Sequence, residues 1–583
     1  MKNYILILTI LVFTSSCSKM LDKNPVDGLS PEQAFSSEQN LQLFINSFYA
    51  TMIPGGNSIF TGDNMSDIIV TRDVPAYLLG QYTSRQAGGW SWGTLRNVNY
   101  FIQNNTNPSI PESVRNRYTG IARFFRAWFY FEKVQQFGGV PWVDRPLSSL
   151  DPDLYGERDT REFVMDKVLE DINFACDHIS DTKDNSSSTV TRWVALALKS
   201  RICLYEGTYR KYHPEMGLSA THESWLADAA SAASEVMLGP YNLYNTGAAT
   251  ADYHQLFLRE TPISSEILLA VIFSNSLRKW HDANWTFTGG SYGANASLNK
   301  RFVDTYLNLN GTRFTDNPAH TTMPFHEEVK NRDTRLQQTI RTPAYRRSDN
   351  SVAPPDFGHT YSGYQIIKWT LPNKALDGKA ENNNSISLIR LGEVLLNYAE
   401  AKAELGTFSA ADWTNTVALL RQRAGITNNP YPSVVDTYLQ QEFFPNISDP
   451  VLLEIRRERG IELVTEGFRY DDLMRWRAGH LLEKEYRGIY VPAMNTNIDL
   501  NEDGAPDVSF VSSAPSTRLP GVYYYVVDNA NVKLSEGTKG NVIWRANQTK
   551  TFQSHKYLRP IPYNEMVLNE NLEQNPGWDS PKD

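Results

Sequence analysis

The segment 115–137 constrains the fold more than any other part of the chain, because it reads as one long helix with an unusually wide apolar face. Its apolar residues recur every three or four positions, which is the helical period. They are Tyr118, Ile121, Ala122, Phe125, Trp128 and Phe129, and Phe124, Phe131 and Val134 widen the face. Gly138, Gly139 and Pro141 follow, and this order predicts the end of the helix. We expect this helix to be buried on more than one side.

Further segments show the same period and predict helices. They are 161–179, 191–206, 225–238, 385–405, 413–424, 451–464 and a shorter one near 471–478. Alanines recur within them, as at Ala195 with Ala197 and Ala229 with Ala230, and small residues let helices approach closely, as in stacked helical hairpins. No repeat of about 34 residues can be overlaid on the chain. The pattern therefore predicts a mainly α protein without defining a repeat.

Two long stretches between the helical segments, 239–311 and 350–384, are rich in Gly, Asn, Ser, Thr and aromatic residues. Loops of this length in a compact protein are commonly functional. The piece 266–273 (EILLAVIF) has the composition of a strand, so we expect the first stretch to be ordered.

The start of the chain predicts export and a lipid anchor. Lys2 precedes a short apolar run at 4–13, and small residues then lead to Cys17. These features are typical of a secretory signal, and the run is too short to cross a bilayer, so we expect residues 1–16 to be removed. The cysteine after the small residues resembles a bacterial lipobox, in which the acylated thiol holds the protein on a membrane. The alternative is an ordinary signal peptide in which Cys17 is incidental.

Charge and cysteine content argue against several kinds of site. The chain has 56 Lys and Arg against 65 Asp and Glu, a net charge of -9 that argues against nucleic acid as a partner. Cys176 and Cys203 lie in apolar helical segments and are expected to be buried free thiols. The sequence has no CxxC pair or Cys/His cluster to support a zinc or redox site. No second apolar run reaches the roughly twenty residues of a membrane helix, so lipid would be the only anchor.

Seven motifs occur in order along nearly the whole chain. They are Cys17 with Leu21-Asp22, Pro25 and Ala34-Phe35; ARFFRAWFYFEKVQQFGGVPWV (122–143); NRDTRL (331–336); LIRLGEVLLNYAEAKAELG (388–406); LRQRAG (420–425); ERGIELVTEGFRYDDLMRW (458–476); and LRPIPYNEMVLNENLEQNPGW (558–578). Together they resemble the SusD/RagB family of surface lipoproteins.

The resemblance implies a mainly α, SusD-like fold, in which four tetratricopeptide-like helix pairs form a scaffold and a loop-rich, irregular part carries the ligand site. It implies one domain over 17–583, with halves at about 17–240 and 241–583. It also implies a non-enzymatic lipoprotein of the cell outer membrane that captures a glycan, docks on a SusC-like TonB-dependent transporter and requires no cofactor. A peptide-binding, RagB-type uptake lipoprotein is the alternative within the family.

Aromatic residues make up 12% of the chain, and several lie in polar loops. Tyr and Trp combine a flat apolar face with a polar edge, which suits sugars, although any single ring more often fills a core. From residue type and loop position we predict a ligand site formed by Tyr77, Tyr82, Trp90, Trp280, Asn284, Trp285 and Tyr292. Asn295 is a further hydrogen-bonding candidate, and Arg72, Arg85, Arg278 and Lys279 are candidates for contacting an acidic sugar. Trp92 is set aside as part of the scaffold.

The segment 499–507 carries oxygen ligands at alternate positions around a glycine. Asp499, Asn501, Asp503 and Asp507 follow the pattern of loops that wrap a calcium ion, and Gly504 supplies the turn. Phe510 stands where an EF-hand would have its bidentate glutamate, so this is not a complete EF-hand. The sequence leaves open a structural Ca²⁺ site and a solvated acidic turn.

Two other constellations resemble catalytic or metal sites. Gly289 to Gly293 satisfies the G-x-S-x-G pattern around Ser291, with His320, His326 and His359 downstream, but a nucleophile elbow needs a strand before it and a helix after it. A glycine-rich binding loop is therefore favoured over a serine hydrolase.

Glu458, Glu462 and Glu466 would share one helix face. The nearby Arg456, Arg459 and Arg469 predict a structural ion network there.

Overall fold

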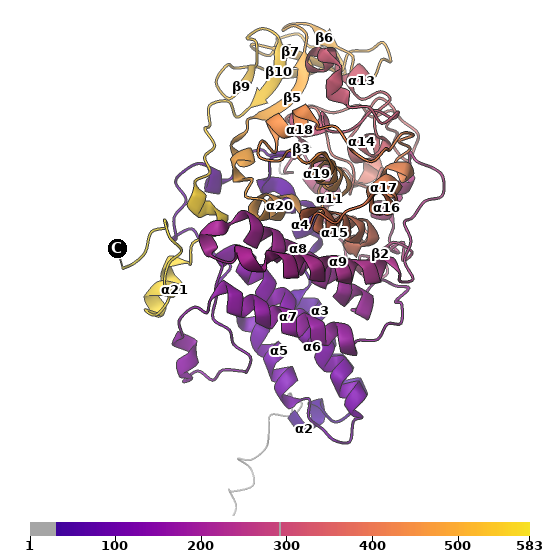
Figure 1. The fold of residues 1–583 in the computed structure, drawn as a ribbon. Helices are drawn as coiled ribbons and strands as arrows, with labels where there is room; N and C mark the ends of the chain where they lie inside the picture. Colours follow the sequence, from indigo (N-terminus) through magenta and orange to yellow (C-terminus); the bar gives the residue numbers. More distant parts are fainter. Residues whose placement is uncertain (1–30, 291–292, 583) are drawn as a thin grey trace, which may run out of the picture.

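The computed structural model describes residues 31–290 and 293–582. The predicted signal peptide, Cys17, Ser291 and Tyr292 lie outside the described residues. Within the described part, the chain is mostly helical, with the helices of its first half in the lower part of Figure 1 and the small sheets of its last hundred residues at the top. A mainly α fold is confirmed.

The long helices form the first half of the chain and the middle of the second. Their bounds are α3 (Glu38–Met52), α5 (Gly93–Asn104), α6 (Glu112–Phe137), α7 (Arg161–His178), α8 (Arg192–Tyr212), α9 (His222–Met237), α15 (Leu391–Glu404) and α19 (Pro450–Glu462). The shorter helices are α2 (Pro31–Ala34), α4 (Gly56–Phe60), α10 (Asp252–Leu258), α11 (Ala283–Thr288), α12 (Lys300–Val303), α13 (Phe325–Glu328), α14 (Thr334–Thr339), α16 (Ala410–Asn415), α17 (Val417–Arg423), α18 (Thr437–Glu442), α20 (Arg469–Arg475) and α21 (Tyr563–Leu568).

Consecutive helices pack on one another. Helix α6 packs on α7, α7 on α8 and α8 on α9, and α15 then packs on α8, α9 and α19. The buried alanines Ala229, Ala232 and Ala233 of α9 remove bulk from its packing face. This arrangement is compatible with stacked helical pairs, while the predicted number of four units stays a prediction.

Local signals account for most helix boundaries. Thr160 and Thr191 cap α7 and α8 with their side-chain oxygens, as the residues that precede helices commonly do. Helix α6 ends at Gly138, whose φ of 77° is readily adopted by glycine. The predicted helix 413–424 is in fact two short helices, α16 and α17, because Thr416 takes a non-helical conformation between them.

In the described residues, the strands form four small sheets. The strand predicted at 266–273 is confirmed as β2 (Ile267–Val271), which pairs antiparallel with β4 (Ile386–Arg390). The predicted helix 385–405 was therefore wrong at its start, because its first residues form β4 and the helix begins at Leu391. The remaining strands are β1 (Ile69–Val70), β3 (Ser297–Leu298), β5 (Tyr486–Val491), β6 (Asn497–Ile498), β7 (Val508–Val511), β8 (Tyr523–Val526), β9 (Val532–Leu534) and β10 (Gly540–Trp544).

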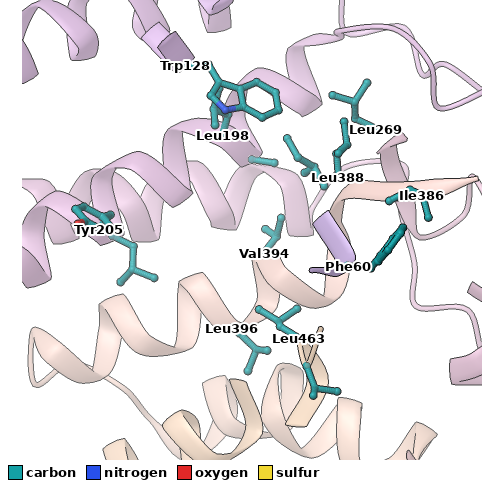
Figure 2. Close-up of a cluster of buried hydrophobic side chains, with 14 of the residues drawn as sticks. Phe60, Trp128, Leu198, Tyr205, Leu269, Ile386, Leu388, Val394, Leu396 and Leu463 are labelled. Carbon is teal, nitrogen blue, oxygen red and sulfur yellow. The ribbon is translucent and has the colours of Figure 1, made fainter. Parts of the chain in front are cut away.

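The hydrophobic core joins the helical scaffold to the β2–β4 pair. Figure 2 shows Leu198 of α8 and Val394 of α15 in one cluster with Leu269 of β2 and Leu388 of β4. All four side chains are buried. Cys176 and Cys203 are buried free thiols, as predicted. Among the residues that the structure describes, no helix has the length and apolar character needed to span a membrane.

A network of buried ion pairs lies around α19. Glu462 accepts hydrogen bonds from Arg335, Arg390 and Arg423, with distances of 2.8 Å to Arg335 and 2.6 Å to Arg390. Glu458 pairs with Arg335 and Arg421, and Glu466 with Lys368 and Arg390. A structural role for the three glutamates is thus supported by their complete pairing.

The predicted partners in this network were wrong. Arg456 pairs with Glu404, Arg459 with Asp472 and Arg469 with Asp67 instead. The arginines nearest in sequence pair with carboxylates of other elements. The glutamates are neutralised from further along the chain: Arg421 lies 37 positions from Glu458 and Arg423 lies 39 from Glu462. Arg390 and Arg335 lie 72 and 127 positions from Glu462.

Candidate ligand-binding site

Among the predicted aromatic residues that the structure describes, Trp280 is the most exposed, with 43% of the residue accessible to solvent. It follows a tight turn in which Ser274 and Lys279 pair through their backbones. Its indole Nε1 donates to Asn275 Oδ1 at 2.7 Å, which fixes the orientation of the ring. The ring lines an open pocket of about 620 Å³, which we call the Trp280 pocket. The pocket is lined by Asn275, Trp280, Ser348, Leu371, Pro372, Asn373, Leu376, Glu381 and Asn383.

Two chain segments form the walls of the Trp280 pocket and are tied together. His281 and Asn382 exchange backbone hydrogen bonds of 3.0 Å, and His281 Nε2 lies 2.9 Å from the carbonyl oxygen of Asn384. The segment around Ser348 joins them through a 3.0 Å bond from its amide to Pro372 and an ion pair between Arg347 and Asp377. The walls are therefore held in place by hydrogen bonds as well as by packing.

Asn284 does not reach the pocket, although we predicted it as a hydrogen-bonding partner for the ligand. The residue has no exposed surface. Its side chain accepts from the amide of Leu371 at 2.8 Å and donates to the carbonyl of Leu371 at 3.0 Å. It also accepts from Asn382 at 2.7 Å. Asn284 thus positions one wall, and in this structure it has no group free for a ligand.

The pocket combines an aromatic face with side chains that donate and accept hydrogen bonds. Amides such as Asn373 and Asn383 do both, and the carboxylate of Glu381 accepts. An exposed indole beside such groups suits a ligand with an apolar face and a rim of hydroxyls. Our sequence reasoning missed Asn275, Ser348, Asn373, Glu381 and Asn383. Three of these five lie in the long polar stretch 350–384. The sequence therefore indicated that this stretch is functional, but it did not indicate which of its residues line the pocket.

Trp285, the other described aromatic residue that we predicted from the stretch 239–311, does not line this pocket. Trp285 lies partly buried on α11 and is absent from the lining residues. Of Tyr292 the structure describes nothing. Asn295 is buried, with 4% exposed, so it too has no open face toward a ligand.

The predicted residues Tyr77, Tyr82 and Trp90 lie outside the Trp280 pocket. Tyr77 is only 5% exposed, and its hydroxyl donates to the carbonyl of Lys556 at 2.8 Å. Tyr82 packs edge-on against Tyr77 and Trp578. The rings of Tyr77 and Tyr82 therefore belong to the packing around Trp578, and we leave them out of the candidate site.

Trp90 lines a different cavity, of about 520 Å³, together with Trp92. Its ring packs edge-on against Trp92 and Phe137. The lining combines leucines with charged and amide side chains. The leucines are Leu95, Leu147, Leu154, Leu568 and Leu572, and the charged and amide residues are Arg96, Asn99, Arg145, Asp153, Glu565 and Asn569. The predicted rings are thus not gathered in one arc, and the polar setting of Trp280 favours its pocket.

The described surroundings of Gly289–Gly293 do not form a nucleophile elbow. Helix α11 precedes Gly289, and the element that follows Gly293 is the strand β3. An elbow has the opposite order, strand then helix. His359 lies against this segment, since a Cβ on Gly290 would be 3.2 Å from its Nε2, and its Nδ1 lies 2.8 Å from Asp356. The order of elements favours a binding or structural loop.

The loop 499–507 joins β6 to β7, and its carboxylates largely bind backbone amides. Asp499 accepts from the amides of Asn501 and Glu502 with Oδ1 and from Gly504 with Oδ2. Asp507 accepts from the amide of Leu500 at 2.7 Å. Burial, with Asp499 and Asp503 nearby, raises the pKa of Asp507 to about 6. This negative charge is compatible with a bound cation. Backbone amides, however, already donate to the oxygens of Asp499 and Asp507 that would coordinate it.

Another group in the described part brings His326, Glu327 and Glu502 close enough to share a cation. The ammonium of Lys330 already pairs with Glu327 at 2.9 Å and with Glu502 at 2.8 Å. This group therefore has an internal counter-charge and gives little support to a metal site.

Comparison with known proteins assigns the chain to a family. The model of the SusD family matches residues 265–578, which is more than half of the chain. A second model, described as starch-binding associating with outer membrane, matches residues 90–204. This protein belongs to the SusD family, as its motifs predicted.

Relatives and solved structures agree over most of the chain. A SusD-like protein of Formosa agariphila is 23% identical over 510 residues, covering 81% of this chain and 90% of the relative. A SusD-like protein of Bacteroides ovatus is 22% identical, covering 92% of this chain and 94% of the relative.

Among solved structures, a SusD-like protein of Bacteroides fragilis matches with a TM-score of 0.69 at 21% identity, covering 95% of this chain and 100% of that one. A SusD-like carbohydrate-binding protein of the same species gives a TM-score of 0.68 at 19% identity, covering 92% of this chain and 99% of that one. These matches confirm the predicted SusD-like fold.

Proposed function

We propose that this protein is a non-enzymatic, lipid-anchored surface protein that binds an oligosaccharide in the Trp280 pocket and delivers it to a SusC-like TonB-dependent transporter. The observation that carries the proposal is the half-exposed indole of Trp280, held by Asn275 in a pocket lined by amides, a hydroxyl and a carboxylate. A sugar ring stacked on that face would place its hydroxyls near these groups.

The family context supports the choice of ligand. One structural neighbour is named a SusD-like carbohydrate-binding protein. Another is the surface glycan-binding protein A of Bacteroides fluxus, with a TM-score of 0.56 at 17% identity, covering 93% of this chain and 100% of that one. The pocket of this chain combines an aromatic face with a polar rim, which suits a ligand of this kind.

Membrane attachment and the transporter partner rest on other observations. The family model over residues 90–204 is described as associating with the outer membrane, and the sequence around Cys17 resembles a lipobox. We propose that acylated Cys17 holds the protein at the outer face of the outer membrane, where it passes its ligand to the transporter. Several acyl chains would hold the protein there stably, whereas a single chain binds a membrane only marginally.

The test is a substitution that removes the stacking face and leaves the polar rim. We expect Trp280→Ala to weaken oligosaccharide binding by about tenfold, and Trp280→Phe to retain most of it, because the ring face contributes on the order of 1.5 kcal/mol. Binding is measured by calorimetry against a panel of oligosaccharides and by retardation in gels that contain polysaccharide.

A matched control separates the two cavities. Tyr155 is 55% exposed and lines the cavity that contains Trp90. We expect Tyr155→Ala to bind oligosaccharide as the unaltered protein does. Loss of binding in Tyr155→Ala together with normal binding in Trp280→Ala would place the ligand in the other cavity.

The two competing functions make different predictions for the same samples. A peptide-binding protein would give heat with peptides and none with oligosaccharides. A hydrolase would release product from bound substrate over time, and Ser291→Ala would stop that release while binding remained. The order of elements around Gly289–Gly293 gives the hydrolase no support.

A further inference from the structure

A polar cavity of about 150 Å³ lies inside the helical part, between α6, α8 and α20. Its lining includes Trp128 and Glu132 of α6, Tyr205 of α8 and Asp471 of α20. We call it the α6 cavity. Two neighbouring cavities, of about 290 and 210 Å³, are also lined by Glu132, so this carboxylate stands at the junction of all three. The three cavities therefore share one carboxyl group.

Glu132 and Asp471 differ from the charged groups around them, because the cations nearest to them, Lys133, Arg201 and Arg559, act on them at a distance and not through an ion pair. Within the described part of the chain, neither forms an ion pair. Glu132 accepts only from Trp128 Nε1 at 2.9 Å, and Asp471 only from Gln135 Nε2 at 3.0 Å. Burial raises the pKa of Glu132. Burial, and then the charge of Asp472, raises the pKa of Asp471 to about 7.

The arginines that line the same cavity already form ion pairs with other carboxylates. Arg201 pairs with Glu393 at 2.6 Å, Arg459 with Asp472 at 2.8 Å and Arg475 with Glu400 at 2.6 Å. The other cations nearby belong to the two outer cavities. Lys133 donates to the carbonyl of Gly89, and Arg559 lies on the outer wall beside Tyr470. Glu132 and Asp471 are therefore carboxyl groups of the α6 cavity that form no ion pair within the described part of the chain.

A further polar group in the cavity lacks a partner. Tyr205 is 3% exposed, and its hydroxyl has no hydrogen-bond partner among the residues that the structure describes. A buried hydroxyl without a partner costs free energy, and a ligand that bonded to it would remove that cost. Figure 2 labels Trp128 and Tyr205 among the buried side chains of the hydrophobic cluster. Both residues also line the α6 cavity.

We propose that the α6 cavity binds the ammonium group of a small amine, with Glu132 and Asp471 as its counter-charges and Tyr205 as a hydrogen-bond partner. The aromatic rings of Trp128, Phe131 and Tyr205 in the lining favour an organic cation, because ring faces attract ammonium groups. A hard metal ion would need several more oxygen ligands. The amine belongs to an amino sugar or to a basic amino acid, and the site is independent of the Trp280 pocket.

The test is calorimetric titration of the purified protein with matched amines. We expect glucosamine or lysine to bind, and N-acetylglucosamine, whose amine is blocked, to give no heat. Tighter binding of glucosamine identifies an amino sugar as the source of the ammonium group, and tighter binding of lysine a basic amino acid. Equal binding of glucosamine and N-acetylglucosamine, equal binding of potassium ions, or no heat with any amine would overturn the proposal.

Variants place the binding in the cavity. Glu132→Gln and Asp471→Asn should each weaken amine binding by at least about tenfold, because each removes one charge of a desolvated pair. Tyr205→Phe should weaken it less. Glu112 lies exposed in the first turn of α6 and serves as the control, so Glu112→Gln should bind as the unaltered protein does. Unchanged binding in both Glu132→Gln and Asp471→Asn would also overturn the proposal.

Discussion

Glu462 lies at the centre of the buried ion-pair network around α19, so Glu462→Gln is a direct test of what that network contributes to stability. The side chain has no exposed surface, and three arginines donate to its carboxylate. Glutamine keeps the shape but removes the negative charge and one acceptor. Arg335 retains Asp333 and Glu458, while Arg423 retains only Glu266. The variant therefore leaves buried positive charge without full compensation.

We expect Glu462→Gln to lower the free energy of unfolding by about 3–5 kcal/mol, the cost of breaking a buried ion pair from one side. The measurement is urea unfolding at pH 7, followed by tryptophan fluorescence. Glu112→Gln serves as an exposed control on α6 and should change the free energy of unfolding by no more than about 0.5 kcal/mol.

The pH dependence provides a second check on the same residue. The surrounding arginines hold the pKa of Glu462 well below its ordinary value of 4.5. A carboxylate with a depressed folded-state pKa contributes stability above its unfolded pKa and loses it as pH falls. The difference between the two proteins should therefore shrink below about pH 4.5. A loss of less than about 1 kcal/mol at pH 7 would refute the view that this network holds the fold together.

Three further predictions follow from single sites. The pKa of Asp471 is raised from 3.8 to about 7, so the folded protein holds this proton more tightly and stability falls as pH rises between these values. Asp471→Asn should therefore raise the free energy of unfolding at pH 8 by at most about 4 kcal/mol and leave it unchanged at pH 4. Thermal melts at both pH values measure this difference. Equal effects of the substitution at pH 4 and pH 8 would contradict the prediction. We propose that the loop around Asp499 binds Ca²⁺, so titration of calcium into chelator-treated protein should give saturable heat that Asp507→Asn abolishes, and no heat would exclude the site. Cys17→Ala should release a folded binder from the membrane and abolish uptake, and unaltered uptake by cells with this variant would disprove the anchor.

The sequence predicted well what depends on neighbours along the chain. The wide apolar face of 115–137 and the glycines after it predicted helix α6 and its end at Gly138, because period and capping are local properties. The strand β2 was equally visible from its composition. The SusD-like fold followed from motifs in order, which the family comparison confirms.

Contacts between distant segments could not be predicted in this way. The residues 386–390 look helical in sequence but form β4, because β2 supplies a pairing edge more than a hundred positions earlier. The arginines that neutralise Glu458, Glu462 and Glu466 come from other elements for the same reason.

The candidate site was predicted only in part. Residue type and loop position identified Trp280, but they cannot show which way a ring faces. Tyr77 and Asn284 were predicted on the same grounds, as an aromatic and an amide residue in polar stretches of the sequence. Both are buried. The polar residues of the 371–383 wall carry no local signature that separates them from other loop residues.

The buried charges explain how a helical scaffold can hold an irregular binding part steady. The wall segment of the Trp280 pocket runs from Leu371 through Asn384 directly into β4, whose last residue is Arg390. Arg390 donates to Glu462 at 2.6 Å and to Glu466 at 2.7 Å, and Glu266, which precedes β2, accepts from it at 3.2 Å. Since β2 leads into the turn that carries Trp280, both walls of the pocket start from strands tied to α19.

This connection makes the network relevant to binding as well as to stability. A substitution at Glu462 that left the protein folded would loosen the end of β4, and with it the wall that faces Trp280. Oligosaccharide binding should then weaken even though Glu462 lies outside the pocket lining, whereas Glu112→Gln should leave it unchanged. Calorimetry on the folded fraction distinguishes the two cases. Normal binding by folded Glu462→Gln protein would show that the walls are held by their own hydrogen bonds alone.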